Sequence, residues 1–480
     1  MPLMNDSPTL RIASPAPPVL NGSVADFARD PIQMMRQLWA LHGEVAALQE
    51  DNHRLFFVFG PMFNHQVLSD NKRFHSQFFA VRGPRKSAQR RVTSGLLSMN
   101  GDEHRDHRRM IMGPFQKKAI QAYHDNVIGM TQDAVSSWNP GDTKDMAEEM
   151  THYMLRLTSS ILFGVDMPEM AYEVGRLTER WVALNHKVGP GIFSSDADVL
   201  HHYDDLLLAA EELEVAVLEM VRKRRSGQLG TDVLSLLIRS NELQSGVSDE
   251  QLVGHMVLMF GAAHLTSAHT LTWTLFLLSQ HPGVMSELHA ELEEHLTGGS
   301  PTPEQIDQLP VLDRVIRESM RIMPASAYSQ RVAAEPVELG PFRLNPGNPV
   351  IFSQFITHHM PSLFPQPEKF LPDRWLTATP SPYAYLPFGA GPRMCIGAPL
   401  GMMQFKISLP TILGKFKLSM VPGAEVQARV MSTMLFPTST IPMRIERQDG
   451  VFTSQPVTGN VHTLVDFPAA TESVATRRAA

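Results

Sequence analysis

The pattern of apolar positions divides the chain into a long helical part and a shorter part of strands and turns. Between residues 117 and 225 apolar residues recur at helical spacing with few breaks. Ser248, followed three positions later by Gln251, is a capping signal for a further helix that we expect to reach about Gln280. Because roughly thirty helical residues span about 45 Å, this helix must pass through the middle of the protein.

The remaining segments show the short alternation and turn signals of strands. We expect a helix that begins at Pro31, a hairpin over residues 44–59, and strands within 330–352, 415–420 and 431–446. Residues 78–98 form a long loop with a helical turn, either an ordinary connection or a lid over a pocket. The whole pattern is typical of a mainly α protein with small β-sheets, in the α+β class.

Both ends of the chain lack this pattern. Residues 1–22 are polar and include Pro15, Pro17 and Pro18, and residues 448–480 have no periodicity. We therefore expect a disordered leader, a single catalytic domain over residues 23–447, and a disordered C-terminal tail.

Composition narrows the class of protein. The chain has 480 residues, is 43% hydrophobic and carries a net charge of −7, which gives no sign of a nucleic-acid partner. The sequence shows neither a signal peptide nor an apolar run of about 18 residues that would anchor it in a membrane. We expect a cytoplasmic monomer.

The stretch from Phe388 to Gly397 contains the only cysteine, Cys395. Its glycines and proline require a tight turn, and a predicted helix follows, whose N-terminus favours a thiolate. Cys395 is therefore a nucleophile or a metal ligand, or else an inert buried thiol. Elsewhere, His104 and Arg108 share one face of a predicted helix, which is either a solvated face or a cationic grip for a carboxylate ligand.

Three motifs together resemble the cytochrome P-450 family of heme-thiolate monooxygenases over residues 25–446. The spacing of Phe388, Gly391, Arg393, Cys395 and Gly397 is similar to the heme-binding signature of that family. Two further motifs match in order and spacing: Glu318-x-x-Arg321, and Pro372-Asp373-Arg374-Trp375. The resemblance implies a triangular prism with a long central helix and a proximal cysteine loop.

The resemblance also implies a cofactor, heme b, and roles for the residues around it. Cys395 would be the axial ligand of the iron, with Phe388 packed over the proximal side. Gly391 and Gly397 would let the backbone approach the porphyrin and the next helix. The heme propionates would be held by four residues, namely His104, Arg108, Arg331 and Arg393. A buried ion network that braces the cysteine loop would contain Glu318, Arg321 and Arg374.

The central helix aligns with the oxygen-binding element of the family at residues 261–268. Thr266 falls on the oxygen-activating threonine, and its hydroxyl can bond the carbonyl four residues earlier. Leu265 replaces the acid that normally relays protons, so Thr266 with ordered water, His264 or Ser267 would have to supply them. His264 is equally interpreted as a packed core histidine, and His269 as structural.

The resemblance finally suggests where a substrate would lie. The corresponding regions are residues 79–97, 181–193, 325–328 and 434–436 and one face of the central helix, and the pocket residues expected from them are Met259, Ala262, Ala263, Ala325 and Leu435. These regions are mostly apolar, which indicates a lipophilic small molecule such as a terpenoid, steroid, fatty acyl or aromatic compound.

Three hypotheses follow. The first is a monooxygenase that uses O2 and electrons from a separate ferredoxin or flavodoxin-type donor, docked near residues such as Arg108, Arg109, Lys117 and Lys118. The second, motivated by Leu265, is a heme-thiolate enzyme that uses peroxide or isomerises its substrate. The third is a non-catalytic heme-binding sensor or carrier.

Overall fold

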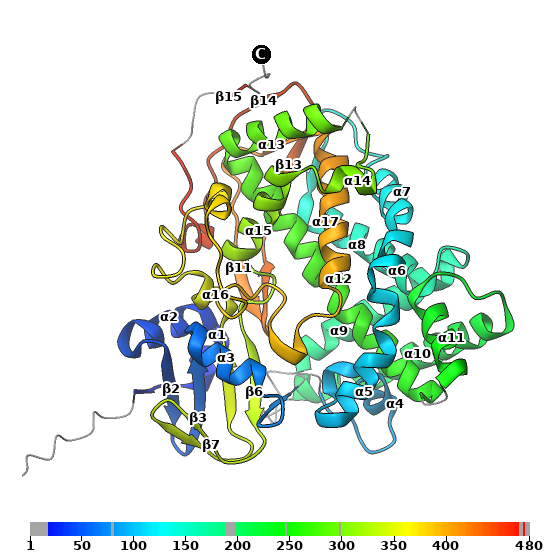
Figure 1. Ribbon diagram of the computed structural model, residues 1–480, viewed down its shortest axis with the longest axis vertical. Helices are drawn as coiled ribbons and strands as arrows, with labels where there is room; N and C mark the ends of the chain where they lie inside the picture. The colour runs from blue at the N-terminus through cyan, green and yellow to red at the C-terminus, as the bar shows by residue number, and fades with distance from the viewer. Residues whose placement is uncertain are drawn as a thin grey trace, which may run out of the picture.

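The computed structural model describes residues 18–77, 81–188, 197–244, 247–296, 299–469 and 474–475. A strand-rich region contains the main sheet, and a larger helical region lies beside it (Figure 1). The helices outside the central one are α1 Val24–Arg29, α2 Pro31–His42, α3 Pro61–Ser69, α4 Ala88–Val92, α5 Gly101–Ile111, α6 Lys117–Ala122, α7 His124–Ala134, α8 Met146–Phe163, α9 Pro168–Val188, α10 Ala197–Ser226, α11 Val233–Gln244, α13 Pro282–His295, α14 Pro303–Ile306, α15 Pro310–Ile322, α16 Gln354–His358 and α17 Ala398–Leu413.

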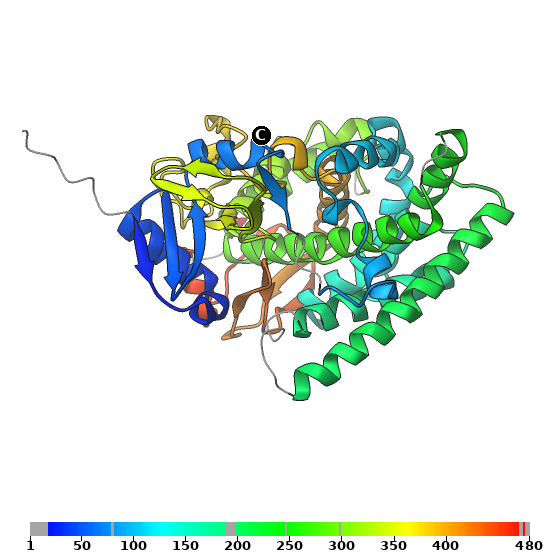
Figure 2. The ribbon, with the colours of Figure 1, turned by 90° about the horizontal axis from the view of Figure 1, so that it is seen from below.

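The predicted central helix is present as α12, Asp249–Gln280. Its capping box is complete: the Ser248 hydroxyl accepts from the Gln251 backbone N–H, and the Gln251 side chain accepts from the Ser248 N–H. The helix crosses the molecule (Figure 2) and packs against α8, α9, α10 and α15. Residues 252–258 and 267–280 are buried on every face, as expected of a helix in the middle of a protein.

The main sheet has six strands in the order β1-β2-β3-β9-β6-β4. The predicted hairpin forms its centre, with Val45 paired to Val58 and Glu50 to His53. The strand bounds are β1 Val19–Asn21, β2 Val45–Glu50, β3 His53–Val58, β9 Pro349–Phe352, β6 Ser329–Ala333 and β4 Phe74–Ser76. This sheet matters for the site because β6 holds Arg331, which is 9% exposed.

Smaller sheets complete the strand-rich part. β10 Phe416–Met420, β13 Pro442–Arg447 and β5 Thr143–Asp145 form a three-stranded sheet, and β7 Val337–Leu339 pairs with β8 Phe342–Leu344. The hairpin of β11 Ala428–Met431 and β12 Met434–Pro437 turns at Ser432, whose φ is +57°. Leu435 of β12 donates its N–H to the Ala325 carbonyl, so two of the regions expected near the substrate lie together.

The structure corrects both predicted ends of the domain. Residues 19–21 of the expected leader form β1, which pairs in parallel with β2, while residues 1–17 lie outside the described residues. The expected tail is ordered over residues 448–469, which we name the C-terminal strap. Its strand β14, Val451–Phe452, pairs with β15, Val474–Ala475. The strap buries five side chains, Phe452, Val457, Val461, Leu464 and Val465.

The C-terminal strap joins parts of the chain that are far apart in sequence. Arg36 of α2 donates to the Thr463 carbonyl at 2.8 Å, and the Asp466 N–H donates to the Glu368 carbonyl at 2.8 Å. Phe467 packs edge to face on Phe276 of α12. Sequence periodicity could not reveal this segment because it consists of short turns and a two-residue strand. Over the described residues, no helix is both long and apolar enough to cross a bilayer.

Candidate active site

The cysteine loop comes directly before α17 and is shaped by glycine. Gly389 and Gly391 have φ values of +68° and +72°, which disfavour other residues. A Cβ on Gly391 would lie 2.2 Å from the Leu68 carbonyl oxygen. The close approach that Gly391 makes within the protein is therefore to α3, and its expected approach to the porphyrin stays a prediction. A Cβ on Gly397 would instead meet the Cys395 sulfur at an ordinary 3.8 Å.

Cys395 is presented at the N-terminal end of α17. Its backbone N–H donates to the Phe388 carbonyl at 2.8 Å, which closes the loop. Its side chain has accessible surface, yet burial among protein atoms raises the pKa of the thiol. The N–H groups of Gly397 and Ala398 and the charge of Arg108 act in the opposite direction and favour the thiolate.

Four cationic or titratable side chains gather beside the cysteine loop. His104 and Arg108 come from α5, Arg331 from β6 and Arg393 from the loop itself. Burial, followed by the charges of Arg393, Arg108 and Arg331, lowers the pKa of His104 to about 4. Burial also lowers the pKa of Arg331 and of Arg393 to about 10. The local environment thus opposes positive charge at each of these groups.

No carboxylate among the described residues balances these charges. Arg108 donates to the Met394 carbonyl at 2.7 Å, and Arg331 donates to the Gln330 carbonyl at 2.9 Å. Arg393 donates to the Met99 carbonyl and, at 2.7 Å, to the side chain of Asn100. Over the described residues no carboxylate forms an ion pair with any of the three arginines. A partly buried group of cations without carboxylate partners is unfavourable unless an anionic ligand joins it, which fits the two propionates of a heme.

Asn100 is a site residue that sequence reasoning missed. Besides holding Arg393, its Oδ1 accepts from the Ser76 N–H at 2.8 Å and its Nδ2 donates to the Ser76 carbonyl at 3.0 Å. It therefore ties β4, the start of α5 and the cysteine loop together. The only signal was its place as N-cap of the predicted helix, a position where Asn is common for other reasons.

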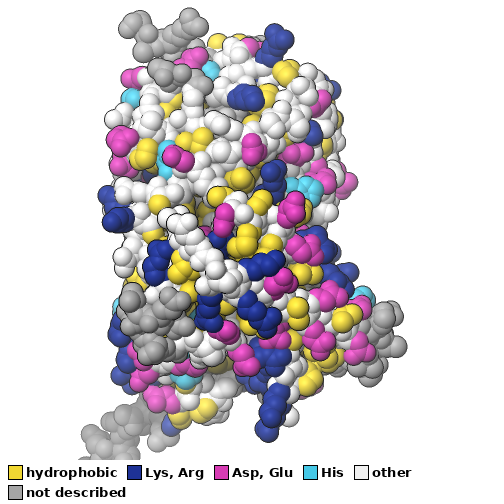
Figure 3. Space-filling view, turned by 90° about the vertical axis from the view of Figure 1, so that its right-hand side faces the viewer, with side chains coloured by type: hydrophobic (Ala, Val, Ile, Leu, Met, Phe, Trp, Pro, Cys, Tyr) yellow, Lys and Arg dark blue, Asp and Glu magenta, His cyan; other side chains and the backbone are white. Residues whose placement is uncertain are grey.

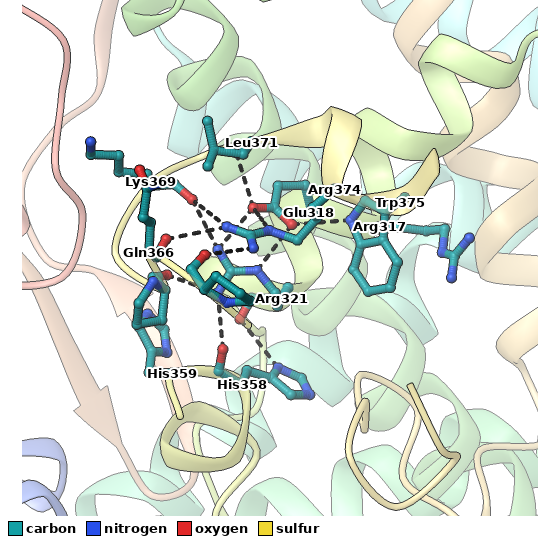
Figure 4. A network of polar contacts seen from close by, with 12 residues as sticks. Arg317, Glu318, Arg321, His358, His359, Gln366, Lys369, Leu371, Arg374 and Trp375 are labelled. Carbon is teal, nitrogen blue, oxygen red and sulfur yellow. Dashed lines mark hydrogen bonds and ion pairs between the residues drawn. The ribbon is translucent and has the colours of Figure 1, made fainter. Parts of the chain in front are cut away.

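The expected ion network behind the loop is present (Figure 4). Glu318 and Arg321 have fully buried side chains and are joined by two hydrogen bonds of 2.8 and 2.9 Å, and Arg374 adds a third of 2.9 Å to Glu318. Glu318 also accepts from the Trp375 indole and the Leu371 N–H, each at 3.0 Å. Its role is structural because every polar atom of the carboxylate is used inside the protein.

His358, which sequence reasoning also missed, connects this network to the cysteine loop. The Leu386 N–H donates to His358 Nε2 at 2.7 Å, so Nδ1 carries the proton and donates to the Arg321 carbonyl at 3.2 Å. Burial, with the charge of Arg321, lowers the pKa of His358 to about 3 and keeps the ring neutral. Leu386 lies two residues before Phe388, so the histidine positions the start of the loop.

The middle of α12 presents accessible surface inside the protein. Ala262 is exposed, and Met259, Ala263 and Thr266 are half-buried, although the helix is buried on both sides of this stretch. These residues recur at a spacing of three and four and thus share one face. The Thr266 hydroxyl donates to the Ala262 carbonyl at 2.7 Å, as the sequence predicted. An apolar face with one hydroxyl is suited to a ligand rather than to core packing.

Of the other two predicted catalytic residues, His264 points away from this face, and Ser267 is buried one turn after Ala263. His264 lies about 200° around the helix from Ala262, and its Nε2 contacts the Thr151 carbonyl on α8 at 3.1 Å. Burial lowers the pKa of His264 to about 4. Of the two interpretations given above, the structure therefore favours a packed core histidine over a proton donor. Ser267 is buried about 100° around the helix from Thr266.

Two of the predicted pocket residues, Ala325 and Leu435, differ in exposure. Ala325 is half-buried beside β12, as a lining residue would be. Leu435 is fully buried, because successive side chains of a strand point to opposite faces, and its neighbours Met434 and Phe436 are the accessible ones. The prediction that Leu435 lines the pocket is therefore corrected: its side chain points away from the accessible face of β12.

The long loop over this region is tied to α9. The amide of Gln89 donates to the Val81 carbonyl at 2.7 Å and its carbonyl oxygen accepts from the Trp181 indole at 2.7 Å. Asn185 accepts from the Val81 N–H at 3.2 Å. These buried bonds hold the loop against the helix, while residues 79–80 and 189–193 of the predicted lining regions lie outside the described residues.

Comparisons with known proteins agree with this geometry. The family model of cytochrome P450 matches residues 13–445. A similar protein, the cyclooctat-9-en-7-ol 5-monooxygenase of Streptomyces melanosporofaciens, is 32% identical over 85% of this chain and 89% of its own length. The pentalenene oxygenase of Streptomyces avermitilis is 25% identical over 87% and 93% of the two chains. The retinoic acid-bound cyanobacterial CYP120A1 structure has a TM-score of 0.76 at 19% identity, covering 90% and 99% of the chains, which shows a shared fold.

The observed site suits the cofactor of that family. Cys395 offers an accessible sulfur with backbone donors around it, and the arginines beside it lack an anion. Across the described residues, both features are explained by one ligand that carries iron and two carboxylates. The chain therefore belongs to the cytochrome P450 family, whose members are heme-thiolate proteins that bind heme b.

Proposed function

We propose that this cytochrome P450 monooxygenase hydroxylates a cyclic terpene-type molecule, with O2 and with electrons from a separate ferredoxin or flavodoxin-type protein. The observation that carries the proposal is the accessible apolar face of α12 at Met259, Ala262 and Ala263, next to the Thr266 hydroxyl. The relatives named above act on cyclooctat-9-en-7-ol and pentalenene, both terpene-type substrates. A hydrocarbon skeleton of this kind gains most of its affinity from burial against such a wall.

Different residues of the chain would hold the heme and orient the substrate. When bound, the heme supplies oxygen activation, which the electron-donating thiolate of Cys395 favours. His104, Arg108, Arg331 and Arg393 would hold its carboxylates. The wall of α12 would orient the substrate and exclude water from it.

Thr266 is the residue we assign to proton handling. Its own proton is committed to the Ala262 carbonyl, so the lone pairs of its oxygen are free to accept a hydrogen bond from a water or a ligand. Leu265 carries no ionisable group, and His264 faces α8. We therefore propose that protons arrive through ordered water that Thr266 positions.

The electron donor is proposed to dock over α5 and α6. Arg109, Lys117 and Lys118 are exposed there, and Arg108 lies beneath them in contact with the cysteine loop. Figure 3 shows Lys and Arg side chains interspersed with acidic ones on the face that includes these helices. A small acidic carrier protein would be attracted to such a surface at low ionic strength.

Reconstitution tests the proposal. The purified protein with heme should give the strongly red-shifted Soret band of a thiolate-ligated carbon monoxide complex, and the Cys395→Ala variant should lose it. With a surrogate ferredoxin and its reductase, a cyclic terpene should yield a product one oxygen atom heavier. Absence of NADPH-dependent oxygen insertion across a panel of cyclic terpenes, with the red-shifted band intact, would refute the substrate class.

A second function is favoured by one observation, the leucine at position 265. An enzyme without an acid at that position has less need of proton delivery if it uses hydrogen peroxide, which already carries its protons. Turnover with peroxide alone that exceeds turnover with the ferredoxin system would favour this alternative. If Leu265→Glu raised dioxygen-dependent turnover several-fold over wild type, an impaired native proton relay would be supported, which also favours this alternative.

A further inference from the structure

One buried histidine near the proposed substrate has no hydrogen-bond partner. His269 lies on α12 and is 4% exposed. Its Nδ1 is completely enclosed, and neither ring nitrogen has a hydrogen-bond partner among the described residues, so a ligand could be met only at Nε2. A buried polar group without a partner is unfavourable, and its persistence calls for an explanation. The neighbouring histidines of α12 each have one ring nitrogen in a contact: His264 Nε2 contacts the Thr151 carbonyl, and His255 Nε2 contacts His107 at 2.9 Å, while Nδ1 of His255 is unpartnered like that of His269.

The position of His269 relates it to the substrate face. Ala262, Thr266, His269 and Trp273 follow one another at spacings of four, three and four, so they form one stripe along α12. Trp273, at the far end, donates its indole N–H to the Leu435 carbonyl at 3.2 Å, which shows that the stripe faces β12. His269 is thus about one helical turn beyond the Thr266 hydroxyl, on the side of the helix that carries Ala262 and Thr266.

The surroundings of His269 are aromatic and uncharged. Its ring lies 4.4 Å from the ring of Phe436, centre to centre, and the His186 ring of α9 lies 6.0 Å from the same phenyl ring on an edge-to-face contact. Burial, with the charges of His264 and His186, lowers the pKa of His269 to about 3, and burial lowers that of His186. Near neutral pH His269 is therefore an uncharged imidazole beside an otherwise apolar wall.

The chemistry of this wall selects a class of ligand. A neutral imidazole offers one N–H donor or one lone pair at Nε2, depending on the tautomer. No charge stands here to balance a carboxylate or an ammonium group, and burying either would be costly. The group that fits is a neutral oxygen, such as an alcohol or ketone, on a molecule that is otherwise hydrocarbon.

We propose that His269 hydrogen-bonds an alcohol or ketone oxygen of the substrate and so selects an already oxygenated terpenoid over the parent hydrocarbon. This inference rests on the proposed function and makes its substrate class more specific. His269 acts as a specificity-determining residue, since it fixes which carbon of the skeleton lies at the Thr266 end of the stripe. The reaction that supplies the substrate would then be one that already introduces a hydroxyl or keto group.

Matched probes test the proposal with the heme-loaded protein. Binding is measured from the spin-state change of the ferric heme with two pairs, cyclododecanol with cyclododecane and cedrol with cedrane. Wild type should bind the alcohol of a pair about ten-fold more tightly than its hydrocarbon, the discrimination expected of one buried hydrogen bond. His269→Leu should remove this ratio by weakening the alcohol alone, and His269→Asn, which keeps a donor and an acceptor, should retain part of it.

A control variant and the opposite outcomes complete the test. Thr272→Val removes a hydroxyl on the same helix that is bonded to the Ala268 carbonyl at 2.9 Å, and should leave the alcohol-to-hydrocarbon ratio at its wild-type value. Equal binding of alcohol and hydrocarbon in wild type, or an unchanged ratio in His269→Leu, would overturn the inference while the proposed function stands. Failure of both members of both pairs to bind would instead overturn the proposed function together with the inference.

Discussion

Replacing Glu318 by glutamine should destabilise the protein far more than the loss of one surface charge. The carboxylate accepts five hydrogen bonds, of which Arg321 supplies two and Arg374, Leu371 and Trp375 one each. A glutamine of the same shape has only one oxygen. Its amide NH2 would place N–H donors opposite the N–H donors that one carboxylate oxygen of Glu318 now accepts from. The guanidinium ions of Arg321 and Arg374 would also lose their counter-charge.

The magnitude follows from burial. Glu318 and Arg321 have side-chain exposures of 0%, and breaking a fully buried pair typically costs about 3–5 kcal/mol. A chain of this length has an unfolding entropy of about 1 kcal/mol per degree, from about 2.1 cal/mol/K per residue. We therefore expect the melting temperature of the heme-loaded protein to fall by about 3–5 °C. The cysteine loop should also loosen, because the network is joined to it through other side chains.

The assay combines circular dichroism melting with the carbon monoxide difference spectrum. The matched control is Glu287→Gln, because Glu287 is 47% exposed and pairs with Arg314 at 2.8 Å, an arrangement usually worth at most about 1 kcal/mol. Glu318→Gln should also reduce the fraction of protein with the red-shifted band, whereas the control should not. Equal melting temperatures in the two variants, with equal red-shifted fractions, would refute the reasoning.

Three further predictions address other contacts. His358→Leu leaves the Leu386 N–H without an acceptor, so unfolding free energy should fall by about 1–3 kcal/mol and the red-shifted fraction should fall with it; an unchanged spectrum would contradict a positioning role. Phe452→Ala should lower the free energy of unfolding, measured by chemical denaturation, by about 3–5 kcal/mol, because Phe452 is buried. Val451→Ala, which changes its exposed neighbour, should lower it by less than about 1 kcal/mol, and equal losses in the two variants would contradict a packed strap. The pKa of His255 is lowered to about 4 by burial and by His107, so the unfolded chain binds a proton that the native protein does not, and stability falls as pH falls from about 6.5 to 4. His255→Asn should flatten that slope by about 1.4 kcal/mol per pH unit, and parallel stability curves for the two proteins would be the contrary result.

The sequence allowed the central helix and the cysteine loop to be predicted because their signals are local. A capping box and an unbroken apolar run specify α12 without reference to the rest of the chain. The turn before α17 is likewise indicated by glycines with positive φ, which other residues do not replace easily. The charge network followed from motifs that carry the family resemblance, and the structure places the three side chains in contact.

Features that depend on contacts between distant segments were missed or misjudged. Asn100 and His358 are unremarkable in sequence, and only the fold brings them to Arg393 and Leu386. Leu435 was expected in the pocket because the family resemblance indicates the region 434–436 but not which side of its strand faces a ligand. His269 was interpreted as structural because the sequence does not reveal whether a buried ring nitrogen finds a partner.

The C-terminal strap imposes an order on biosynthesis. Arg36 and Thr463 are separated by 427 positions, so α2 leaves the ribosome long before its partner has been translated. Early segments generally fold first during synthesis, and α2 must wait for the strap to reach it. The contacts between α2 and the strap therefore form only after residue 463 has been translated. A nascent chain that stops after residue 447 already contains every proposed heme-contacting residue and still exposes the apolar surface that the strap covers, which makes it a substrate for chaperones and proteases.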